Sequence, residues 1–282
     1  MIYITLDGGL GNLMFQYAFG LSIQQTLDCE IRCISAVPTT PELLNVFGLN
    51  RVIRSGTPPL RHLITGKLRK VLTGIPRVVE EESLAFEPGL LGRIREGQQV
   101  VGYFQSPHYW RGLESEVRKQ FTFRRPLSEF TEVLGGQIQS DLSVSIHVRR
   151  GDYLALSHTH HVLGIDYYER AVAHMEEVFE RKASYYVFSN DLDWAADHLP
   201  VPRDRMHLVR NPAENLDFED LFLMTQCRHH IIANSSFSWW GAYLANQEDQ
   251  YVSAPARWFT PDKLNQHVAP SLYLPHWKVF AS

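Results

Sequence analysis

Two adjacent arginines beside a histidine and an aspartate form the most informative group of side chains in the sequence. Arg149 and Arg150 come directly after the apolar run 143–148, which contains His147, and Asp152 follows two residues later. In a strand, His147 and Arg149 point to one face and Arg150 to the other. Guanidinium forks match phosphate oxygens bidentately, so the pair suits a diphosphate. Asp152 is a candidate base or an orienting partner for an arginine, and a surface turn held by Asp152 is the structural alternative.

A glycine-rich turn near the start of the chain could approach a ligand closely. Gly8, Gly9, Gly11 and Asn12 follow the β-rich run 2–6 and precede a helical pattern. Glycine lets the backbone come near a ligand, and a helix N-terminus attracts anions. The spacing matches neither the dinucleotide fingerprint nor a Walker A loop, so neither is supported.

A third group of polar side chains follows the apolar run 185–188. Ser189, Asn190 and Asp191 come directly after it, and Asp191 with Asp193 matches the Asp-x-Asp pattern that holds a divalent ion on sugar nucleotides in some transferases. Asp191 also stands where a helix needs an N-cap, and we favour that role. His158, His160 and His161 lack fixed ligand spacing, so we expect a mobile loop there and no metal site.

The fourth group combines hydroxyls with aromatic rings. Asn234, Ser235, Ser236 and Phe237 lead into Trp239-Trp240, and hydroxyls at a helix start can hold phosphate. The two tryptophans either pack in the core, which we favour, or face a sugar. One helix earlier, Asp220 is either a surface charge or an acceptor for the two donors on the edge of guanine.

Composition limits the classes of protein to which the chain can belong. Its 282 residues are 44% hydrophobic and 21% charged, which predicts a folded protein of two domains or one large α/β domain. The formal net charge of −4 argues against a nucleic-acid binder. No apolar run reaches the roughly 18 residues that span a bilayer, and no signal peptide is evident. Three cysteines, expected as small buried residues, fit a reduced, cytoplasmic protein.

The elements that carry these groups alternate between strands and helices. Strands are expected over 2–6, 31–34, 143–148, 185–188, 206–209, 230–233 and 251–254, and helices over 13–27, 166–182, 216–227 and from Trp239. Asp166 is the expected N-cap of its helix, with Glu169 completing a capping box. Alternation of this kind predicts parallel sheets, with a domain boundary near 126–140.

All four polar groups follow a predicted strand. In open α/β sheets, ligands bind at the carboxyl ends of the strands. Four groups at such ends are a stronger indication of a binding site than any single one. We therefore predict that they line one ligand site.

A basic segment lies between the first two strands and the rest of the chain. Residues 51–79 contain seven Lys or Arg and no acid, with apolar residues at helical spacing from Leu60 to Leu72. We favour an ordinary helix with a solvated basic face. Contact with an anionic membrane surface or an acceptor is the alternative.

The sequence resembles the bacterial α-1,2-fucosyltransferases of glycosyltransferase family 11. The resemblance rests on four strings in the family's order, Gly8-Gly9-Leu10-Gly11-Asn12-Leu13-Met14-Phe15-Gln16, Ser145-Ile146-His147-Val148-Arg149-Arg150-Gly151-Asp152-Tyr153, Phe188-Ser189-Asn190-Asp191 and Asn234-Ser235-Ser236-Phe237-Ser238-Trp239-Trp240. It implies an α/β, GT-B-like fold of two Rossmann-type halves whose parallel sheets face across a cleft. Residues 1–130 would be the acceptor-side domain and residues 131–282 the GDP-fucose-binding domain.

The resemblance also implies an activity, namely inverting transfer of fucose from GDP-β-L-fucose to the 2-hydroxyl of a galactoside, without a metal or other cofactor. Arg149 and Arg150 would bind the diphosphate, and His147 and Asp220 would lie near guanine. The candidate catalytic residues are Arg149, Arg150 and Asp152. The candidate donor-binding residues are Gly9, Gly11, Asn12, His147, Arg149, Arg150, Ser189, Asn190, Asp191, Asp220, Asn234, Ser235, Ser236 and Phe237.

Several alternatives stay open from the sequence. Another fucosyl linkage, another GDP-sugar, a metal-dependent Asp-x-Asp transferase and a non-catalytic glycan- or nucleotide-binding protein each fit part of the pattern. The resemblance implies a galactose-terminated glycan as the acceptor, free or lipid-linked. The expected location is the cytoplasm, with peripheral contact at the inner membrane as an alternative, and no nucleic-acid partner is expected.

Overall fold

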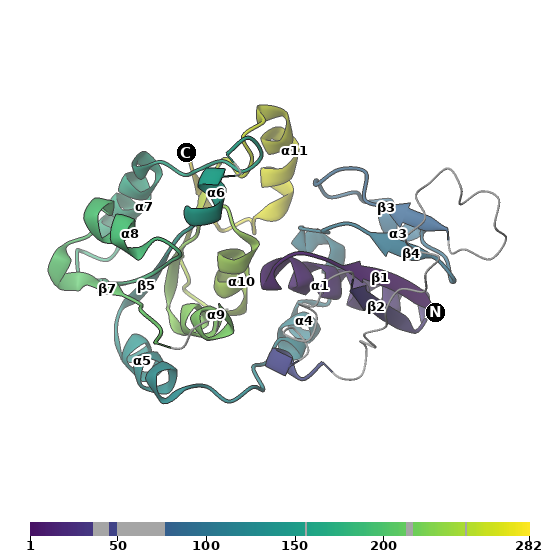
Figure 1. Cartoon of the computed structure of the whole chain (residues 1–282), viewed down its shortest axis with the longest axis horizontal. Helices are drawn as coiled ribbons and strands as arrows, with labels where there is room; N and C mark the ends of the chain where they lie inside the picture. Colours follow the sequence, from purple (N-terminus) through teal and green to yellow (C-terminus); the bar gives the residue numbers. More distant parts are fainter. Residues whose placement is uncertain (36–44, 50–76, 156, 213–216, 246) are drawn as a thin grey trace. The chain divides into compact units, whose positions relative to one another are not determined.

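The chain folds into two compact units, Met1–Arg125 and Pro126–Ser282. The computed structural model describes residues 1–35, 45–49, 77–155, 157–212, 217–245 and 247–282 (Figure 1). Of the basic segment 51–79, all but the last three residues lie outside the described residues. No helix among the described residues is long and apolar enough to cross a membrane.

The N-terminal unit is built on a parallel sheet. In its described part the strand order is β2-β1-β4-β3, and every adjacent pair is parallel. Its elements are β1 (Ile2–Leu6), α1 (Leu10–Leu27), β2 (Ile31–Ser35), β3 (Val78–Glu80), α3 (Leu90–Arg93), β4 (Gln99–Val101), the 3-10 turn η3 (Pro107–Trp110) and α4 (Glu114–Gln120). The strands predicted over 2–6 and 31–34 are confirmed.

The first helix begins earlier than predicted. Helix α1 starts at Leu10, three residues before the expected start at Leu13, with Gly9 as its N-cap. Gly8 has φ +94°, a conformation that L side chains rarely adopt, and it turns the chain directly from strand into helix. Gly11 and Asn12 therefore lie in the first turn of the helix, and Gly8 and Gly9 form the turn that leads into it.

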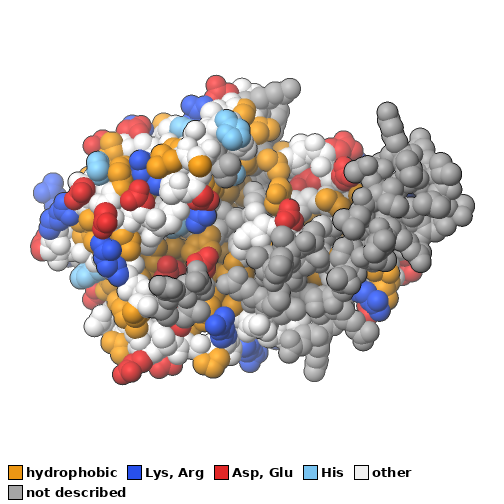
Figure 2. Space-filling view, in the orientation of Figure 1, with side chains coloured by type: hydrophobic (Ala, Val, Ile, Leu, Met, Phe, Trp, Pro, Cys, Tyr) orange, Lys and Arg blue, Asp and Glu red, His pale blue; other side chains and the backbone are white. Residues whose placement is uncertain are grey.

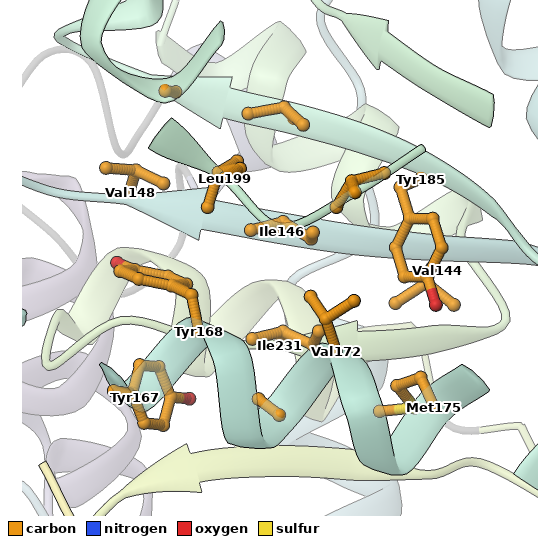
Figure 3. Close-up of a cluster of buried hydrophobic side chains, with 14 of the residues drawn as sticks. Val144, Ile146, Val148, Tyr167, Tyr168, Val172, Met175, Tyr185, Leu199 and Ile231 are labelled. Atoms are coloured by element: carbon orange, nitrogen blue, oxygen red, sulfur yellow. The ribbon is translucent and has the colours of Figure 1, made fainter. Parts of the chain in front are cut away.

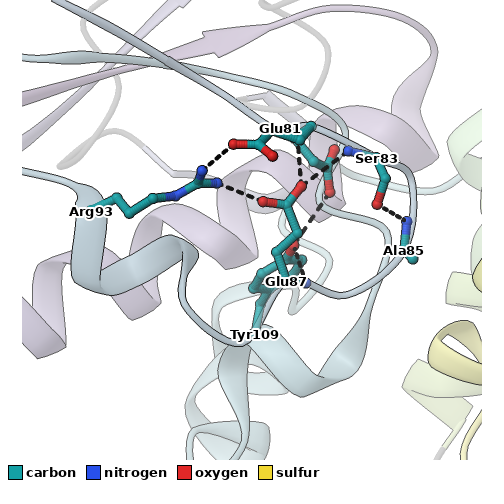
Figure 4. A network of polar contacts seen from close by, with 7 residues as sticks. Glu81, Ser83, Ala85, Glu87, Arg93 and Tyr109 are labelled. Atoms are coloured by element: carbon teal, nitrogen blue, oxygen red, sulfur yellow. Dashed lines mark hydrogen bonds and ion pairs between the residues drawn. The ribbon is translucent and has the colours of Figure 1, made fainter.

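Acidic side chains fix the segments at the carboxyl ends of β3 and β4. The Glu81 Oε2 atom accepts hydrogen bonds from the backbone N–H groups of Tyr103, at 2.9 Å, and Phe104, at 3.0 Å. Glu87 accepts from the N–H of Ser83 at 3.0 Å and from Arg93 at 2.6 Å (Figure 4). Burial raises the pKa of Glu81 to about 7. These bonds satisfy backbone donors that have no partner in the sheet and so order this edge.

The C-terminal unit is built on a larger parallel sheet. Its described strands have the order β10-β9-β8-β5-β6-β7, and every adjacent pair is parallel. Its elements are α5 (Glu129–Ser140), β5 (Ser143–Val148), α6 (Gly151–Ala155), α7 (Ile165–Val178), β6 (Ser184–Ser189), α8 (Leu192–His198), the 3-10 turn η4 (Arg203–Arg205), β7 (Met206–Leu208), α9 (Asp217–Gln226), β8 (His229–Ile231), α10 (Ser236–Ala245), β9 (Val252–Pro255), α11 (Asp262–Leu272) and β10 (Lys278–Phe280).

This strand order defines where a ligand is expected. Numbered from β5 along the chain, the sheet reads 3-2-1-4-5-6, the order of the doubly wound dinucleotide-binding fold. The direction of winding reverses between β5 and β8, and ligands bind at the carboxyl ends of strands at such a switch point. The two parallel α/β units confirm the predicted GT-B-like class of fold.

Both faces of this sheet are covered, so the central strands are buried throughout. All six residues of β5 are buried. Val144, Ile146 and Val148 pack with Tyr168 and Val172 of α7 on one face (Figure 3). A separate cluster, which includes Ile138 of α5, Phe188 of β6 and Leu223 of α9, covers the other. Rigid packing on both sides fixes the positions of the strand ends.

Two predicted helix starts were wrong. Gly164, not Asp166, is the N-cap of α7, and no side chain caps this helix, so Glu169 forms no capping box. Asp166 instead accepts from Arg170 at 2.6 Å, one turn along the helix. Helix α7 also ends at Val178 instead of residue 182. Helix α10 starts at Ser236, three residues before Trp239.

Candidate functional site

The two arginines follow β5 at the switch point of the sheet. The strand ends at Val148, paired with Ser189 of β6, so Arg149 and Arg150 emerge beside the residues that follow β6. The Arg149 Nη2 atom donates to Asp152 Oδ2 at 2.8 Å, and both side chains are partly exposed. Asp152 therefore holds Arg149 and not Arg150.

Asn190 joins the ends of β5 and β6. Its Oδ1 atom accepts from the backbone N–H groups of Arg150, at 3.0 Å, and Gly151, at 3.3 Å. Its Nδ2 atom donates to Asp152 Oδ1 at 3.2 Å. A Cβ on Gly151 would lie 2.8 Å from the same Nδ2 atom, so a larger residue here would displace the Asn190 side chain. Both oxygens of Asp152 thus accept hydrogen bonds. The carboxylate orients the Arg149 side chain and also holds Asn190, which closes the turn.

Arg150 is held differently from Arg149. Its Cζ atom lies 3.9 Å from the centroid of the Trp194 ring, and its Nε atom lies 3.8 Å from Asp191 Oδ2. The side chain is only 18% exposed, and the buried Nε atom has no hydrogen-bond partner. Asp191 Oδ1 accepts from the N–H of Trp194 at 3.2 Å, which confirms its predicted role as the cap of α8. Sequence reasoning missed Trp194, although its position three residues after a capping aspartate placed it in the first turn of a helix.

A hydrogen bond from α6 connects the segment after β8 with the turn that follows β5. Tyr153 donates from its hydroxyl to the backbone oxygen of Asn234 at 3.1 Å. The buried Asn234 side chain donates to the backbone oxygens of His161, at 2.7 Å, and Trp258, at 2.9 Å, and its Oδ1 atom has no partner. Asn234 therefore secures two loops, and its amide nitrogen is not available to a ligand.

The first residues of α10 have two kinds of environment, the N-terminus of the helix and the buried core. Ser235 and Ser236 lie at the N-terminus of this helix, where the backbone N–H groups of Ser236 and Phe237 are close to its positive end. The Ser235 Oγ atom accepts from the N–H of Phe237 at 3.4 Å. Trp239 and Trp240 are fully buried, so the favoured prediction of core packing is confirmed.

Two further candidate residues, His147 and Asp220, are buried and titratable. His147 has a partnerless Nδ1 atom, its ring centroid lies 5.9 Å from that of Phe237, and burial, followed by the charge of Arg149, lowers its pKa to about 3. Burial, followed by the charges of Asp217 and Glu219, raises the pKa of Asp220 to about 7, and its buried Oδ1 atom has no partner. Unpartnered buried polar atoms are costly, which is the condition expected where a ligand supplies the partner.

The glycine-rich residues belong to the N-terminal unit. Gly9 and Gly11 lie at the cap and in the first turn of α1, and Asn12 Oδ1 accepts from Gln105 Nε2 at 2.8 Å. Gln16 bridges the strand ends nearby, since it donates to the backbone oxygens of Asp7, at 3.2 Å, and Gly102, at 3.1 Å. Hydrogen bonds to the segments that follow β1 and β4 therefore hold the first turns of α1 in place.

The side chains disfavoured as metal ligands on sequence grounds have structural partners. Asp193 forms an exposed ion pair with Arg210 at 2.9 Å. His160 stacks on Tyr153, with ring centroids 4.5 Å apart. Within the described ranges, no group of three or more His, Cys, Asp or Glu side chains is placed to hold a metal ion. Cys29, Cys33 and Cys227 are free and buried, as predicted.

Comparison with known protein sequences gives a consistent family. The profile described as "Glycosyl transferase family 11" matches residues 96–281. The chain is 28% identical to the O-antigen biosynthesis glycosyltransferase WbnK of Escherichia coli, over 92% of this chain and 95% of the relative. It is 27% identical to an Escherichia coli alpha-1,2-colitosyltransferase, over 94% of both. It is 26% identical to human galactoside alpha-(1,2)-fucosyltransferase 1, over 64% of this chain and 51% of that enzyme.

A solved structure supports the fold. The chain is similar to a variant of Arabidopsis thaliana FUT1 that was determined in complex with GDP, with a TM-score of 0.52. The similarity covers 93% of this chain and 72% of that one, at 11% sequence identity.

Proposed function

The chain belongs to glycosyl transferase family 11, and on that premise we propose that it transfers L-fucose from GDP-β-L-fucose to the 2-hydroxyl of a terminal galactoside, with inversion. The observation that carries the proposal is the pair of arginines at the switch point of the C-terminal sheet. Relatives named as alpha-1,2-colitosyltransferase and galactoside alpha-(1,2)-fucosyltransferase support the linkage.

The arginines supply the charge that the reaction needs. As the bond between C1 of fucose and GDP stretches, the sugar gains oxocarbenium character and negative charge grows on the β-phosphate. Arg149 and Arg150, with the N–H groups at the start of α10, would stabilise that charge without reorganising. Arg150 is the better placed for a phosphate because its guanidinium, among the described residues, is involved in stacking and a distant carboxylate and not in hydrogen bonds.

The guanine base would bind at the two buried titratable side chains, Asp220 and His147. An ionised Asp220 offers two acceptor oxygens to the N1–H and N2–H₂ donors of guanine, a pair that adenine does not present. His147 is neutral at physiological pH because of its lowered pKa, so its free Nδ1 atom can take part in a hydrogen bond without carrying charge. The remaining donor contacts are proposed for Gly9, Gly11, Asn12, Ser189, Asn190, Asp191 and Asn234–Phe237.

Asp152 fits a positioning role better than that of a base. Both of its oxygens accept hydrogen bonds from protein donors, Arg149 and Asn190. Each oxygen keeps a second lone pair, but hydrogen bonds from a cation and an amide stabilise the ionised form and make Asp152 a weaker base. We propose that Asp152 orients Arg149 and that a loose transition state needs little assistance from a base until late.

The two units would divide the substrates. Residues 131–282 carry most of the proposed donor contacts, and we assign residues 1–130 to the acceptor side, where a galactose-terminated glycan, free or lipid-linked, would bind. On the face drawn in Figure 2, acidic and basic side chains are interspersed among the coloured residues, which suits a small-molecule donor better than a nucleic acid. Free, buried cysteines support a cytoplasmic location.

The first experiment measures GDP release. Purified protein is given GDP-fucose with lactose, with and without EDTA, beside GDP-mannose and a colitose donor. Release that is specific for fucose and resistant to EDTA, with the linkage of the product identified by NMR, would establish the donor, the absence of a metal requirement and the 1,2 linkage. Release from the colitose donor alone, EDTA-sensitive release, or nucleotide binding without transfer to any galactoside would contradict it.

The phosphate role of the arginine is tested on the same assay. Arg150→Ala is expected to lower the rate by roughly 10²–10³-fold, the usual cost of one preorganised donor of charge stabilisation. GDP affinity is measured by calorimetry and folding by circular dichroism. A folded variant that keeps more than about a tenth of the rate would contradict the assignment.

A further inference from the structure

The ring of Trp194 is held more firmly than a surface aromatic would be. Its backbone N–H donates to Asp191 Oδ1 at 3.2 Å, and its backbone oxygen lies 2.9 Å from the His198 Nδ1 atom. The His198 ring stacks on the indole with centroids 4.8 Å apart and 10° between planes. The indole also packs against the buried cluster that contains Val148 and Leu199. The first turn of α8 and the core therefore fix the plane of this ring.

This plane is the surface on which the Arg150 guanidinium lies. A Cζ-to-centroid distance of 3.9 Å is short enough for face-to-face stacking, which attracts a cation through the ring quadrupole. Stacking uses the flat face of the guanidinium and none of its N–H donors, which point outward in its plane. Asp191 approaches Arg150 at the Nε atom, 3.8 Å from Oδ2, which is too far for a hydrogen bond.

We propose that Trp194 is a positioning residue, which holds the Arg150 guanidinium in the plane that presents its two terminal nitrogens to the β-phosphate of the nucleotide sugar. The inference rests on the proposed function. Arginine has several rotatable bonds, and an unsupported guanidinium would lose rotamer freedom each time it bound a phosphate. A platform that restricts the side chain beforehand reduces this loss and leaves every donor free.

The platform also explains the difference between the two arginines. Arg149 lies farther from an aromatic ring, 5.7 Å from the centroid of Tyr153, and is fixed through a hydrogen bond that occupies its Nη2 atom. Arg150 is fixed without such a bond. A residue that must give both terminal nitrogens to a ligand needs this second arrangement.

The test is a double-mutant cycle read out as GDP affinity. Trp194→Leu removes the ring and keeps an apolar side chain, and we expect it to weaken GDP binding by roughly 2- to 30-fold, the range of a cation–π contact. Trp194→Phe keeps a platform and is expected to restore most of that loss. In the Arg150→Ala background, Trp194→Leu is expected to change GDP affinity less than about twofold, because the group through which it acts is gone.

A matched control removes another cation–aromatic pair, in β10 of the same unit. Lys278 lies 5.6 Å from the ring of Phe280 in β10, and Phe280→Leu is expected to leave GDP affinity unchanged. Should Trp194→Leu fail to fold, fluorinated tryptophans placed at residue 194 alone weaken the quadrupole without changing the shape. GDP affinity and kcat are then expected to fall stepwise with the number of fluorines, while KM for the galactoside stays constant.

The outcomes separate this inference from the proposed function. Equal effects of Trp194→Leu with and without Arg150, or no response to fluorination, would overturn the positioning role while wild-type protein still binds GDP and transfers fucose. Wild-type protein that binds no GDP would overturn both.

Discussion

At the scale of single residues, two neighbouring arginines have different environments. Arg149 shares a hydrogen-bonded ion pair with Asp152 and is 36% exposed, whereas Arg150 is 18% exposed and is held by stacking. Exposed ion pairs contribute little energy because water and salt screen them. The position of Arg149 therefore tolerates change better than that of Arg150.

The role of Asp152 can be decided by one substitution. Asp152→Asn keeps a hydrogen-bond acceptor for Arg149 and removes the charge, so we expect kcat to fall by less than about tenfold, with an unchanged pH–rate profile. Asp193→Asn is the matched control, since it removes the carboxylate of another Asp–Arg pair in the same unit. A loss of more than about 10²-fold, together with loss of the basic limb of the profile, would identify Asp152 as a general base.

The guanine-binding role proposed for Asp220 predicts that nucleotide binding depends on pH. The Asp220 pKa of about 7 is raised above the usual value by burial and then by Asp217 and Glu219, so the free protein holds a proton there below pH 7. Binding of guanine requires the ionised form. GDP affinity is therefore expected to fall by about tenfold per pH unit below pH 7 and to level off above it.

Calorimetry across about pH 5.5–8.5 measures the GDP affinity of the wild type and of two variants. Asp220→Asn is expected to bind GDP weakly and without the pH dependence, because an amide replaces one acceptor with a donor. Asp217→Asn is expected to move the midpoint to lower pH by removing a nearby like charge. GDP affinity that is equal in wild type and Asp220→Asn would remove Asp220 from the guanine site.

At the scale of elements, the strand-to-helix turns determine where the candidate groups lie. Helix α1 begins directly after β1 because Gly8 adopts φ +94° and Gly9 caps the helix. After β5, the turn at Gly151 is closed by Asn190, which leaves no space for a side chain. Glycine at Gly8 is a requirement of the backbone, and glycine at Gly151 leaves room for the Asn190 side chain, so neither gives direct information about ligands.

The two adjacent glycines of the first turn provide a matched test. A Cβ on Gly8 would lie 2.7 Å from Asn12 Nδ2 and would occupy a left-handed conformation, whereas a Cβ on Gly9 would meet nothing within 4 Å. We expect Gly8→Ala to lower the free energy of unfolding by roughly 1–2 kcal/mol, and Gly9→Ala to change it little. Denaturant titration of both variants measures the difference, and equal losses would contradict the local geometry.

At the scale of the whole molecule, the proposed donor site is concentrated in one unit. The order 3-2-1-4-5-6 brings the carboxyl ends of β5 and β8 together, and the hydrogen bonds of Tyr153 and Asn190 connect them with β6. The unit has its own buried clusters on both faces of the sheet. Its first segment is tied down by Glu219, which accepts from Ser128 and Thr131 at 2.8 Å each.

This arrangement predicts that residues 126–282 can be separated from the rest. We expect the fragment to fold and to bind GDP within about tenfold of the affinity of the full chain, since only the contacts proposed for Gly9, Gly11 and Asn12 are missing. Transfer to lactose is expected to be lost. Circular dichroism, calorimetry and the GDP-release assay check these points, and a folded fragment that does not bind GDP would show that the N-terminal unit is essential to the nucleotide site.

The sequence alone predicted seven of the ten strands that the structure describes, four of its longer helices and the family, but not β3, β4 or β10. Strands over 143–148 and 2–6 were predicted with their observed bounds, because the apolar runs and the turn residues that end them act over a few positions. The cap of α8 by Asp191 was predicted for the same reason. The cap of α7 was not, because Gly164 and Asp166 both suit a helix start and only the packed backbone distinguishes them.

Only the tertiary structure decided which distant residues meet. Strand β8 lies beside β5 although more than 80 residues separate them, and this pairing depends on the packing of the whole sheet. The same packing left the Oδ1 atom of Asp220 without a partner and placed Trp194 against Arg150. Such partners are set by the sum of many long-range contacts, and no pattern within a short stretch of sequence contains that information.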